Sequence, residues 1–376
     1  MADYSHIYFI GIGGIGMSAI ARYFISHGQV VAGYDKTPSE LTRQLEREGM
    51  LIHYEENIDM IPHACRNNKS CLVIYTPAIP AEHKELVYFQ ENGFEIQKRA
   101  QVLGTLTHAH KGLCVAGTHG KTSTSTMCAH IMHQSHLDCN AFLGGISKNY
   151  ATNCILSDSD YVVIEADEFD RSFHWLSPWI SVITSTDPDH LDIYGDSAHI
   201  HEAFKAFAAQ VSGTVITKYG LDITEQDTKA KILRYSFDDP RADFHASEIS
   251  IDRCGYFTFT LVWPGGRIPG CKVGIPGWVN VENAVAASAI ALTYGLEPEK
   301  VKAALEAFEG VKRRFDIHLN TPECSYIDDY AHHPKEIATA ISSMRDIFPG
   351  RKLTAVFQPH LYTRTRDFAD EFAESL

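Results

Sequence analysis

Three times along the chain, a short apolar strand runs through a loop into a helix, and this repeated start constrains the fold most strongly. The first start runs from His6–Ile10 into a helix over residues 17–27, and the second from residues 112–116 into a helix over residues 121–134. The third begins at a strand over residues 325–327. Strands that alternate with helices predict parallel, doubly wound sheets, so we expect an α/β protein. A length of 376 residues is sufficient for two or three such domains.

The first expected domain is Rossmann-like and covers residues 1–104. Further short strands are predicted at residues 30–33, 72–75 and 95–97. The second of its strands ends just before Asp35. Short strands of this kind, separated by helices, are typical of an open parallel sheet.

The second expected domain covers residues 105–312 and contains the second start. Apolar stretches at residues 161–164 and 180–184 would extend its parallel sheet. Residues 244–251 and 256–263 alternate between apolar and polar positions around a turn. Such alternation predicts a small antiparallel side sheet.

The third expected domain covers residues 313–376 and again has a Rossmann-like start. Its strands are predicted at residues 325–327 and 353–357, with two helices. Two strands are fewer than an open parallel sheet usually has, so we expect this domain to be incomplete as given. We also expect slow turnover by this chain, because an incomplete lid cannot hold a water-excluding site closed.

The balance of charge argues against a general nucleic-acid or membrane-surface binder. The chain has 47 acidic and 33 basic residues and a formal net charge of -14, whereas such binders need a basic face. No apolar run approaches the roughly 20 residues of a membrane span, and no signal peptide is evident. The nine cysteines are scattered without Cys-x-x-Cys spacing, which is typical of thiols in a reducing compartment. We therefore expect a cytoplasmic protein.

The strongest single motif is a phosphate loop over residues 117–122, with the sequence Gly-Thr-His-Gly-Lys-Thr. Its backbone N–H groups and the following helix N-terminus can hold phosphate oxygens. Lys121 would neutralise the β and γ phosphates, and the Thr122 hydroxyl would bind Mg²⁺. The general motif also has a glycine where this chain has Val115, so only the shorter form matches. The alternative is an ordinary strand–helix turn.

Two polar clusters follow the next two strands of the same predicted sheet. Glu165 opens the run Glu-Ala-Asp-Glu, and His190 lies in an acidic run after the next strand. Ligands of α/β sheets bind beyond the carboxyl ends of strands, where a carboxylate can hold Mg²⁺. Each cluster alone could be a solvated loop or a structural histidine, but the two together indicate a metal site near the phosphate loop.

The first glycine loop, over residues 11–16, matches the dinucleotide pattern G-x-G-x-x-G, and Asp35 follows 19 residues after Gly16. This pattern places a diphosphate at the helix N-terminus and a carboxylate near a ribose hydroxyl. NAD has both of these groups, and so does a UDP-sugar. The residues alone leave both ligands open.

Amide and guanidinium side chains complete the candidate site residues. Asn280 and Asn283 lie three residues apart on one face of a predicted helix start and could contact an adenine edge, or they could be caps or buried amides. Arg364 and Arg366 could bind a carboxylate or phosphate in fork geometry, or they could form a solvated face.

Together these motifs make the chain resemble the Mur ligase family from about His6 to Leu376. The most specific segments are the first glycine loop, residues 116–122, 165–170, 189–195, 328–334 and 357–367. The resemblance implies a UDP-sugar domain, an ATP domain with an antiparallel side sheet, and a C-terminal domain that closes over the site. It implies ATP-dependent ligation of L-alanine to the lactyl carboxylate of UDP-N-acetylmuramate through an acyl phosphate, in bacterial peptidoglycan synthesis.

The resemblance also implies roles for individual residues, with ATP and Mg²⁺ (or Mn²⁺) as cofactors. Catalytic positions match Lys121, His119, Glu165 and His190, and the metal ligands match Thr122, Glu165 and His190. The ATP contacts match Gly117, Thr118, His119, Gly120, Lys121, Thr122, Ser123, Asn280, Asn283, Arg314 and Asp328. The contacts to UDP-N-acetylmuramate and L-alanine match Gly11, Gly13, Gly14, Gly16, Met17, Ser18, Asp35, Thr76, Asp167, His332, Arg364 and Arg366. A monomer or weak homodimer is expected.

The chain departs from the family pattern in three places, one of which is its short C-terminal domain. Val279 stands where many members have His, and Leu361 replaces a common Arg. Three alternatives remain open at this point: a sibling ligase that adds a tripeptide to the same UDP-sugar, an NAD-dependent dehydrogenase, and a nucleotide-binding regulator without catalysis. The dehydrogenase alternative leaves the phosphate loop, Glu165 and His190 without a use.

Overall fold

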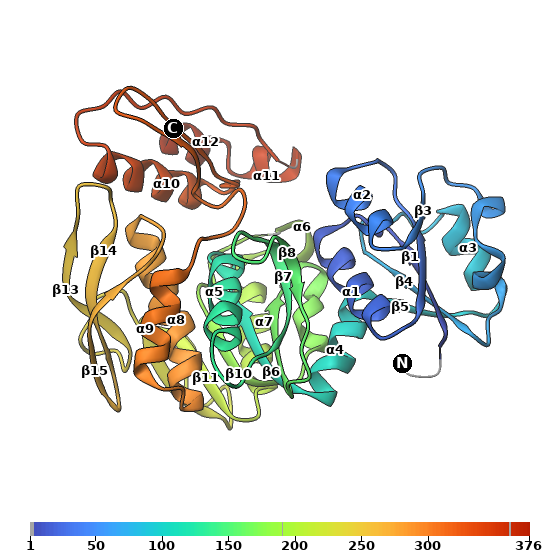
Figure 1. Ribbon diagram of the computed structural model, residues 1–376, viewed down its shortest axis with the longest axis horizontal. Coiled ribbons are helices and arrows are strands. Elements are labelled where there is room, and N and C mark those ends of the chain that lie inside the picture. Colours follow the sequence, from blue (N-terminus) through green and yellow to red (C-terminus); the bar gives the residue numbers. More distant parts are fainter. Residues whose placement is uncertain (1–3, 190, 361) are drawn as a thin grey trace.

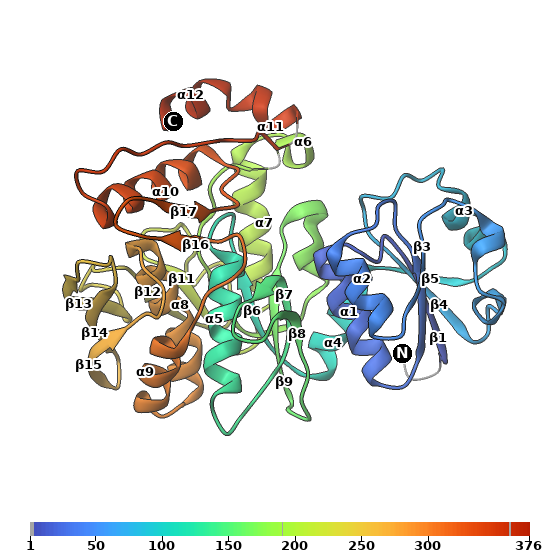
Figure 2. The same cartoon turned by 45° about the horizontal axis from the view of Figure 1, so that its top comes forward.

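The computed structural model describes residues 4–189, 191–360 and 362–376. They form three α/β units in chain order, and the α/β fold expected from the sequence is confirmed (Figure 1). The N-terminal unit lies beside the central unit, and the C-terminal unit lies over the end of the central unit at which α5 begins (Figures 1 and 2). No helix in the described parts of the chain is long and apolar enough to cross a membrane.

The N-terminal unit is a five-stranded parallel sheet in the order β3-β2-β1-β4-β5. Its first glycine loop joins β1 to α1, as the sequence predicts. The elements are β1 (His6–Ile10), α1 (Ile15–Ser26), β2 (Val30–Tyr34), α2 (Glu40–Arg47), β3 (Leu51–His53), η1 (Ile58–Met60), η2 (His63–Arg66), β4 (Cys71–Tyr75), α3 (Lys84–Glu91), β5 (Glu95–Lys98) and α4 (Arg99–Ala109). The boundary expected at residues 104/105 falls inside α4.

The central unit is built on a seven-stranded sheet in the order β12-β11-β10-β6-β9-β7-β8, in which only β8 is antiparallel to its neighbour. The elements of the sheet and its helices are β6 (Lys111–Ala116), α5 (Lys121–His133), β7 (Asn140–Ser147), β8 (Thr152–Ile155), β9 (Tyr161–Ala166), η3 (Phe169–Trp175), β10 (Pro178–Ile183), α6 (Leu191–Tyr194), α7 (Ser197–Ala209), β11 (Thr214–Lys218), β12 (Lys231–Tyr235), α8 (Trp278–Tyr294) and α9 (Pro298–Ala307).

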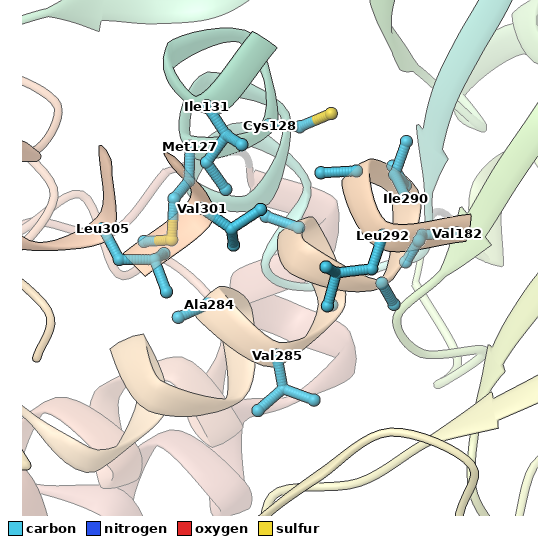
Figure 3. Packing of buried hydrophobic residues seen from close by; sticks show 14 of the residues in the cluster. Met127, Cys128, Ile131, Val182, Ala284, Val285, Ile290, Leu292, Val301 and Leu305 are labelled. Carbon is cyan, nitrogen blue, oxygen red and sulfur yellow. The ribbon is translucent and has the colours of Figure 1, made fainter. Parts of the chain in front are cut away.

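Strand β6 shows why this sheet needs helices on both faces. Leu113 and Val115 belong to the core that contains α5 and α8, whereas Cys114 and Ala116 belong to the core that contains α7. All four side chains are fully buried, as expected for a parallel strand covered on both sides. In the first of these cores, side chains of α5 such as Met127 pack near those of α8 and α9 (Figure 3).

The predicted antiparallel side sheet is present, and it has a third strand that the sequence analysis did not identify. Its strands are β13 (His245–Ile251), β14 (Phe257–Trp263) and β15 (Gly266–Lys272). The third strand contains Pro269 and two glycines, Gly266 and Gly270, and these residues weaken a strand pattern in sequence.

The C-terminal unit holds the two-stranded antiparallel sheet β16–β17 and three helices. The elements are β16 (Asp316–Asn320), β17 (Ser325–Asp328), α10 (Pro334–Ile347), α11 (Tyr362–Asp367) and α12 (Ala369–Ser375). The strand predicted over residues 353–357 is wrong: this segment pairs with no strand in the described chain, and Val356 is 95% exposed. A strand forms only where a neighbour completes its hydrogen bonds, and the apolar pattern alone does not provide one.

The N-terminal unit is attached to the central unit through α1 and the hairpin β7–β8 (Figure 2). Asn153 of β8 donates from Nδ2 to the Ile15 carbonyl (2.5 Å) and to Ser18 Oγ (3.0 Å), and it also accepts a hydrogen bond from Arg22. These buried polar contacts fix the start of α1, and with it the first glycine loop, relative to the central sheet.

Candidate active site

The phosphate loop has the backbone that its glycines predict. Gly117 (φ +131°) and Gly120 (φ +80°) both adopt conformations that side-chain-bearing residues disfavour. A Cβ at Gly117 would lie 2.0 Å from Thr184 Oγ1, so the loop closes against the end of β10 only because this residue is glycine. Ser185 also holds the loop, since its Oγ accepts from the backbone N–H of His119 at 2.8 Å.

Lys121, the first residue of α5, lies inside a group of carboxylates. Its Nζ donates to the Gly117 carbonyl at 2.6 Å and forms an ion pair with Glu168 at 2.8 Å. Burial opposes the lysine charge, but the carboxylates of Glu168, Asp167 and Glu165 outweigh it and raise the pKa of Lys121 to about 12. The lysine therefore stays positive, as a phosphate ligand must.

Thr122 and Glu165 meet beside this lysine, as the sequence predicts. The Thr122 hydroxyl donates to Glu165 Oε1 at 3.1 Å, and Glu165 Oε2 accepts from the Gly144 N–H at 3.1 Å. The described residues contain no group of three or more His, Cys, Asp or Glu side chains placed so that they alone could hold a metal ion. Mg²⁺ commonly takes only one or two carboxylates and completes its shell with water and phosphate oxygens, so this hydroxyl and carboxylate fit that ion.

His119 points from the phosphate loop toward the C-terminal unit. Its Nδ1 lies 3.4 Å from Glu336 of α10, and its Nε2 lies 3.6 Å from Asp187. Burial opposes ionisation of Glu336, but the hydrogen bond to His119 and nearby positive charge hold the pKa of this carboxyl well below its usual range. Lys335 adds a second link between the units through Asp187 at 2.5 Å.

Arg364 of α11 reaches back to the central unit. Its Nε and Nη2 bind the Asp189 carboxylate at 3.0 to 3.2 Å, and both side chains are almost fully buried. This is the fork geometry by which arginine binds a carboxylate. Asp189 belongs to the second polar cluster predicted from the sequence, so this contact joins that cluster to the C-terminal unit.

Two cavities meet at the phosphate loop and share Gly120, Ser123, Arg314 and Glu336. The first measures about 370 Å³ and the second about 340 Å³. The first brings together Thr118, Lys121, Thr122, Glu165, Asp167, Glu168, Asp189, His332, His360 and Arg364. The second extends toward α8 and is lined by His119, Asn280 and Asn283, among others.

Gly13 and Gly16 of the first loop lie close to side chains from other segments. A Cβ at Gly13 would lie 2.8 Å from Asp35 Oδ2, which accepts from the Gly13 N–H at 2.7 Å. A Cβ at Gly16 would lie 2.4 Å from Arg99 Nη1. Arg99 in turn binds Asp167 at 2.8 Å, so one guanidinium links the first loop to the acidic cluster of the central unit.

The other residues predicted to bind substrate at the first loop are Met17, Ser18, Thr76, Gly11 and Gly14. Met17 and Ser18 are buried in α1, and the Ser18 hydroxyl accepts a hydrogen bond from Asn153. The Thr76 methyl lies 2.8 Å from the point where Gly11 would carry a Cβ. Gly14 is the N-cap residue of α1.

Arg366 and Asp328, predicted to contact L-alanine and ATP, do not line either cavity. Arg366 is largely exposed and pairs with Asp367 at 2.7 Å. Asp328 lies 3.6 Å from Arg313, and it is the next residue, Asp329, that lines the second cavity. His190 lies outside the described residues.

The site also contains residues that the sequence analysis did not single out. Glu168 and Asp187 lie in the two acidic clusters, so the acidic composition of these segments could have pointed to them. Arg99 and Glu336 gave none, because they reach the site from α4 and α10, far away in sequence.

The fold and the site together define a nucleotide-dependent enzyme of the phosphate-loop type, with one α/β unit on either side of the loop domain. Family models match almost the whole chain: Mur ligase family, catalytic domain (residues 6–111), Mur ligase middle domain (115–291) and Mur ligase, glutamate ligase domain (313–376). The chain belongs to the Mur ligase family.

Relatives agree with this assignment over the same extent. The chain is 57% identical to a UDP-N-acetylmuramate–L-alanine ligase of Phocaeicola vulgatus and 52% identical to one of Porphyromonas gingivalis, covering 98% of this chain and 81% and 82% of those proteins. The crystal structure of UDP-N-acetylmuramate-alanine ligase from Thermotoga maritima is similar with a TM-score of 0.84 at 30% identity, covering 99% of this chain and 83% of that one. A murein peptide ligase from Psychrobacter arcticus gives 0.76 at 26% identity, with 95% and 79% covered.

Proposed function

We propose that this chain ligates L-alanine to the lactyl carboxylate of UDP-N-acetylmuramate while ATP becomes ADP and phosphate. The observation that carries the proposal is the convergence of Lys121, Glu165 and Arg364 on one cavity, between the phosphate loop and the C-terminal unit. The relatives that match 98% of the chain and share the name of an L-alanine ligase support the choice of acceptor.

The first step joins two anions, and the site supplies positive charge where they meet. The lactyl carboxylate attacks the γ-phosphorus of ATP, which gives an acyl phosphate and ADP. Lys121 and the loop N–H groups stabilise the charge on the phosphates. A magnesium ion held by Thr122 and Glu165, with His190 as a further expected ligand, would neutralise more of this charge.

Lys121 must change partners for this step. In the structure Lys121 forms an ion pair with Glu168 at 2.8 Å. We expect the phosphates of ATP to take over this lysine, which leaves Glu168 to be compensated by other cations. This exchange keeps the buried lysine ionised in both states.

In the second step the amine of L-alanine attacks the acyl carbon and expels phosphate. Arg364 is the expected ligand of the alanine carboxylate. Its bidentate contact with Asp189 supports this role, because it places a fork that accepts a carboxylate in the wall of the cavity. An incoming carboxylate would share or displace that contact.

The direct test is phosphate release from ATP in the presence of UDP-N-acetylmuramate, with and without L-alanine. We expect release that depends on both. If a tripeptide replaced L-alanine with higher kcat/KM, the chain would be the sibling ligase. If release needed neither acceptor and tight NADH binding appeared instead, the ligase proposal would be wrong.

A further inference from the structure

The second cavity is formed by two helices from different units. One wall is the start of α8, where the lining residues are Trp278, Val279, Asn280, Glu282 and Asn283. The facing wall is a single stripe of α10, formed by Lys335, Glu336, Thr339, Ala340 and Ser343. Spacings of three and four residues place these side chains on one helix face. Since α10 lies next to α8 (Figure 1), this cavity depends on the C-terminal unit being in place.

Ser343 is a buried hydroxyl that lines this cavity. The residue is 1% exposed, and its Oγ has no hydrogen-bond partner among the residues that the structure describes. The Oγ lies 4.0 Å from the point where Gly277, the N-cap of α8, would carry a Cβ. A buried hydroxyl without a partner destabilises a fold, so its presence facing a cavity indicates that a ligand completes its hydrogen bonds.

Trp278 gives the opposite wall a flat aromatic surface. Its ring is partly buried and meets Phe237 edge-on at 5.9 Å. Tyr235 and Phe315 also line the cavity. Aromatic rings around a few polar groups are suited to a flat heteroaromatic ring, because any base presents a face for stacking.

The amides beside Trp278 have one hydrogen-bonding atom each already engaged. Asn280 donates from Nδ2 to the Pro276 carbonyl at 2.6 Å, and Asn283 accepts at Oδ1 from Thr124 at 3.2 Å. Asn280 therefore presents an acceptor and Asn283 a donor, a pair that suits the polar edge of a purine.

We propose that Trp278 and Ser343 determine how this site binds the nucleotide base: the indole stacks on the purine, and the Ser343 hydroxyl hydrogen-bonds to its polar edge. The inference rests on the proposed use of ATP and adds two residues that hold its base. The bound base would also hold two units of the protein together. Because Ser343 belongs to α10, a bound purine links the C-terminal unit to α8 independently of the triphosphate.

The test of Ser343 uses the full chain, MgADP and a matched pair of variants. Ser343→Ala removes the buried hydroxyl, and Ser342→Ala removes an exposed hydroxyl next to it. Without nucleotide, we expect Ser343→Ala to melt at or above the wild-type temperature, since the unpartnered group is gone. With MgADP, we expect its Kd to rise about fivefold and its thermal shift to shrink. Ser342→Ala should match the wild type in both. A Kd for Ser343→Ala within twofold of wild type would overturn the role of Ser343.

The role of Trp278 is tested by the KM for ATP and by tryptophan fluorescence. We expect Trp278→Ala to raise the KM for ATP about tenfold or more, and Trp278→Phe to restore most of the loss. MgADP should quench the fluorescence of the wild type and of Trp175→Phe, a control at an exposed tryptophan, but not that of Trp278→Phe. An unchanged KM in Trp278→Ala would remove Trp278 from the site.

The two proposals fail in different ways. If the wild type binds MgADP and all of these variants match it, the assignment of the base site is wrong and the ligase function stands. If the wild type itself binds no MgADP, both proposals are wrong.

Discussion

The chain contains two loops of the same design, each between a parallel strand and a helix, and they differ in where the positive charge comes from. The loop before α5 carries its own cation, because Lys121 folds back onto Gly117. The loop before α1 has no lysine, and its nearest guanidinium, Arg99, comes from α4. The shared loop and helix N-terminus therefore allow both sites to bind a phosphate. The nearby cation and carboxylates determine which phosphate compound binds and whether a phosphoryl group is transferred.

The acidic neighbours of the two loops differ in the same way. Glu165, Asp167 and Glu168 surround Lys121, which suits metal-assisted phosphoryl transfer. At the first loop, the Asp35 carboxylate accepts from the Gly13 N–H. This arrangement suits binding without chemistry. Asp167 belongs to both sites through Arg99, so the two loops are connected.

The largest effect should come from removing the cation of the phosphate loop. Lys121→Ala leaves three carboxylates without their central positive charge, and we expect turnover to fall by about 1000-fold, at the upper end of what one electrostatic donor contributes. Steady-state phosphate release measures this. Lys300→Ala, at an exposed position of α9, is the control and should retain wild-type turnover. Near-normal turnover in Lys121→Ala would show that the Lys121 charge does not contribute to phosphoryl transfer.

The next largest effect should come from the carboxylate beside Thr122. Glu165→Gln keeps the shape but loses the charge that holds a hard cation, so we expect turnover about 100-fold lower and a higher Mg²⁺ requirement. A magnesium titration of the initial rate measures both. Asp158→Asn, an exposed acid before β9, should leave the titration unchanged. An unshifted magnesium dependence in Glu165→Gln would exclude this residue as a metal ligand.

Because Arg99 contacts the first loop, its removal should raise the KM for one substrate and not for the other. Arg99→Ala removes the guanidinium beside Gly16, and we expect the KM for UDP-N-acetylmuramate to rise about 30-fold while the KM for ATP stays within twofold. Lys98→Ala, whose partner is Asp170 at 2.8 Å, removes a neighbouring and more exposed cation and should change both constants little. An equal rise in both constants for Arg99→Ala would mean that the arginine only holds the units together.

The smallest effect concerns stability in the N-terminal unit, away from both loops. Burial raises the pKa of Glu85 to about 7, although hydrogen bonds from Tyr8 (2.6 Å) and Asn57 oppose the rise. Folding therefore favours the protonated acid. Its stabilising contribution is complete below pH about 4.5 and is lost as the pH rises through about 7.

Glu85→Gln should remove this pH dependence, because the amide oxygen can still accept from Tyr8. Urea unfolding at pH 5 and pH 8 measures it. We expect the free energy of unfolding to fall between these values by about 2 to 3 kcal/mol more in the wild type than in Glu85→Gln. Parallel pH profiles for the two proteins would show that Glu85 ionises normally.

Local sequence signals predicted the elements that hold the phosphates. The order strand, glycine loop and helix was correct at both loops, and Thr122 does meet Glu165. The order of elements follows from residues close together in the chain, whereas Thr122 meets Glu165 because the loop after β6 and the end of β9 lie at the same edge of the sheet. The pairing of β16 with β17, the absence of a strand at residues 353–357, and the approach of Glu336 to His119 depend on contacts between distant segments. A single sequence carries no signal for such contacts.

The central claim is that the two loops bind two different phosphate compounds, and calorimetric titration of each ligand into two variants tests it most directly. We predict that Lys121→Ala loses measurable MgATP binding and keeps its affinity for UDP-N-acetylmuramate. Arg99→Ala should show the reverse, with MgATP affinity kept and UDP-N-acetylmuramate bound about 30-fold more weakly. If each variant lost both ligands equally, or if MgATP and UDP-N-acetylmuramate competed for one site in the wild type, the account would be contradicted.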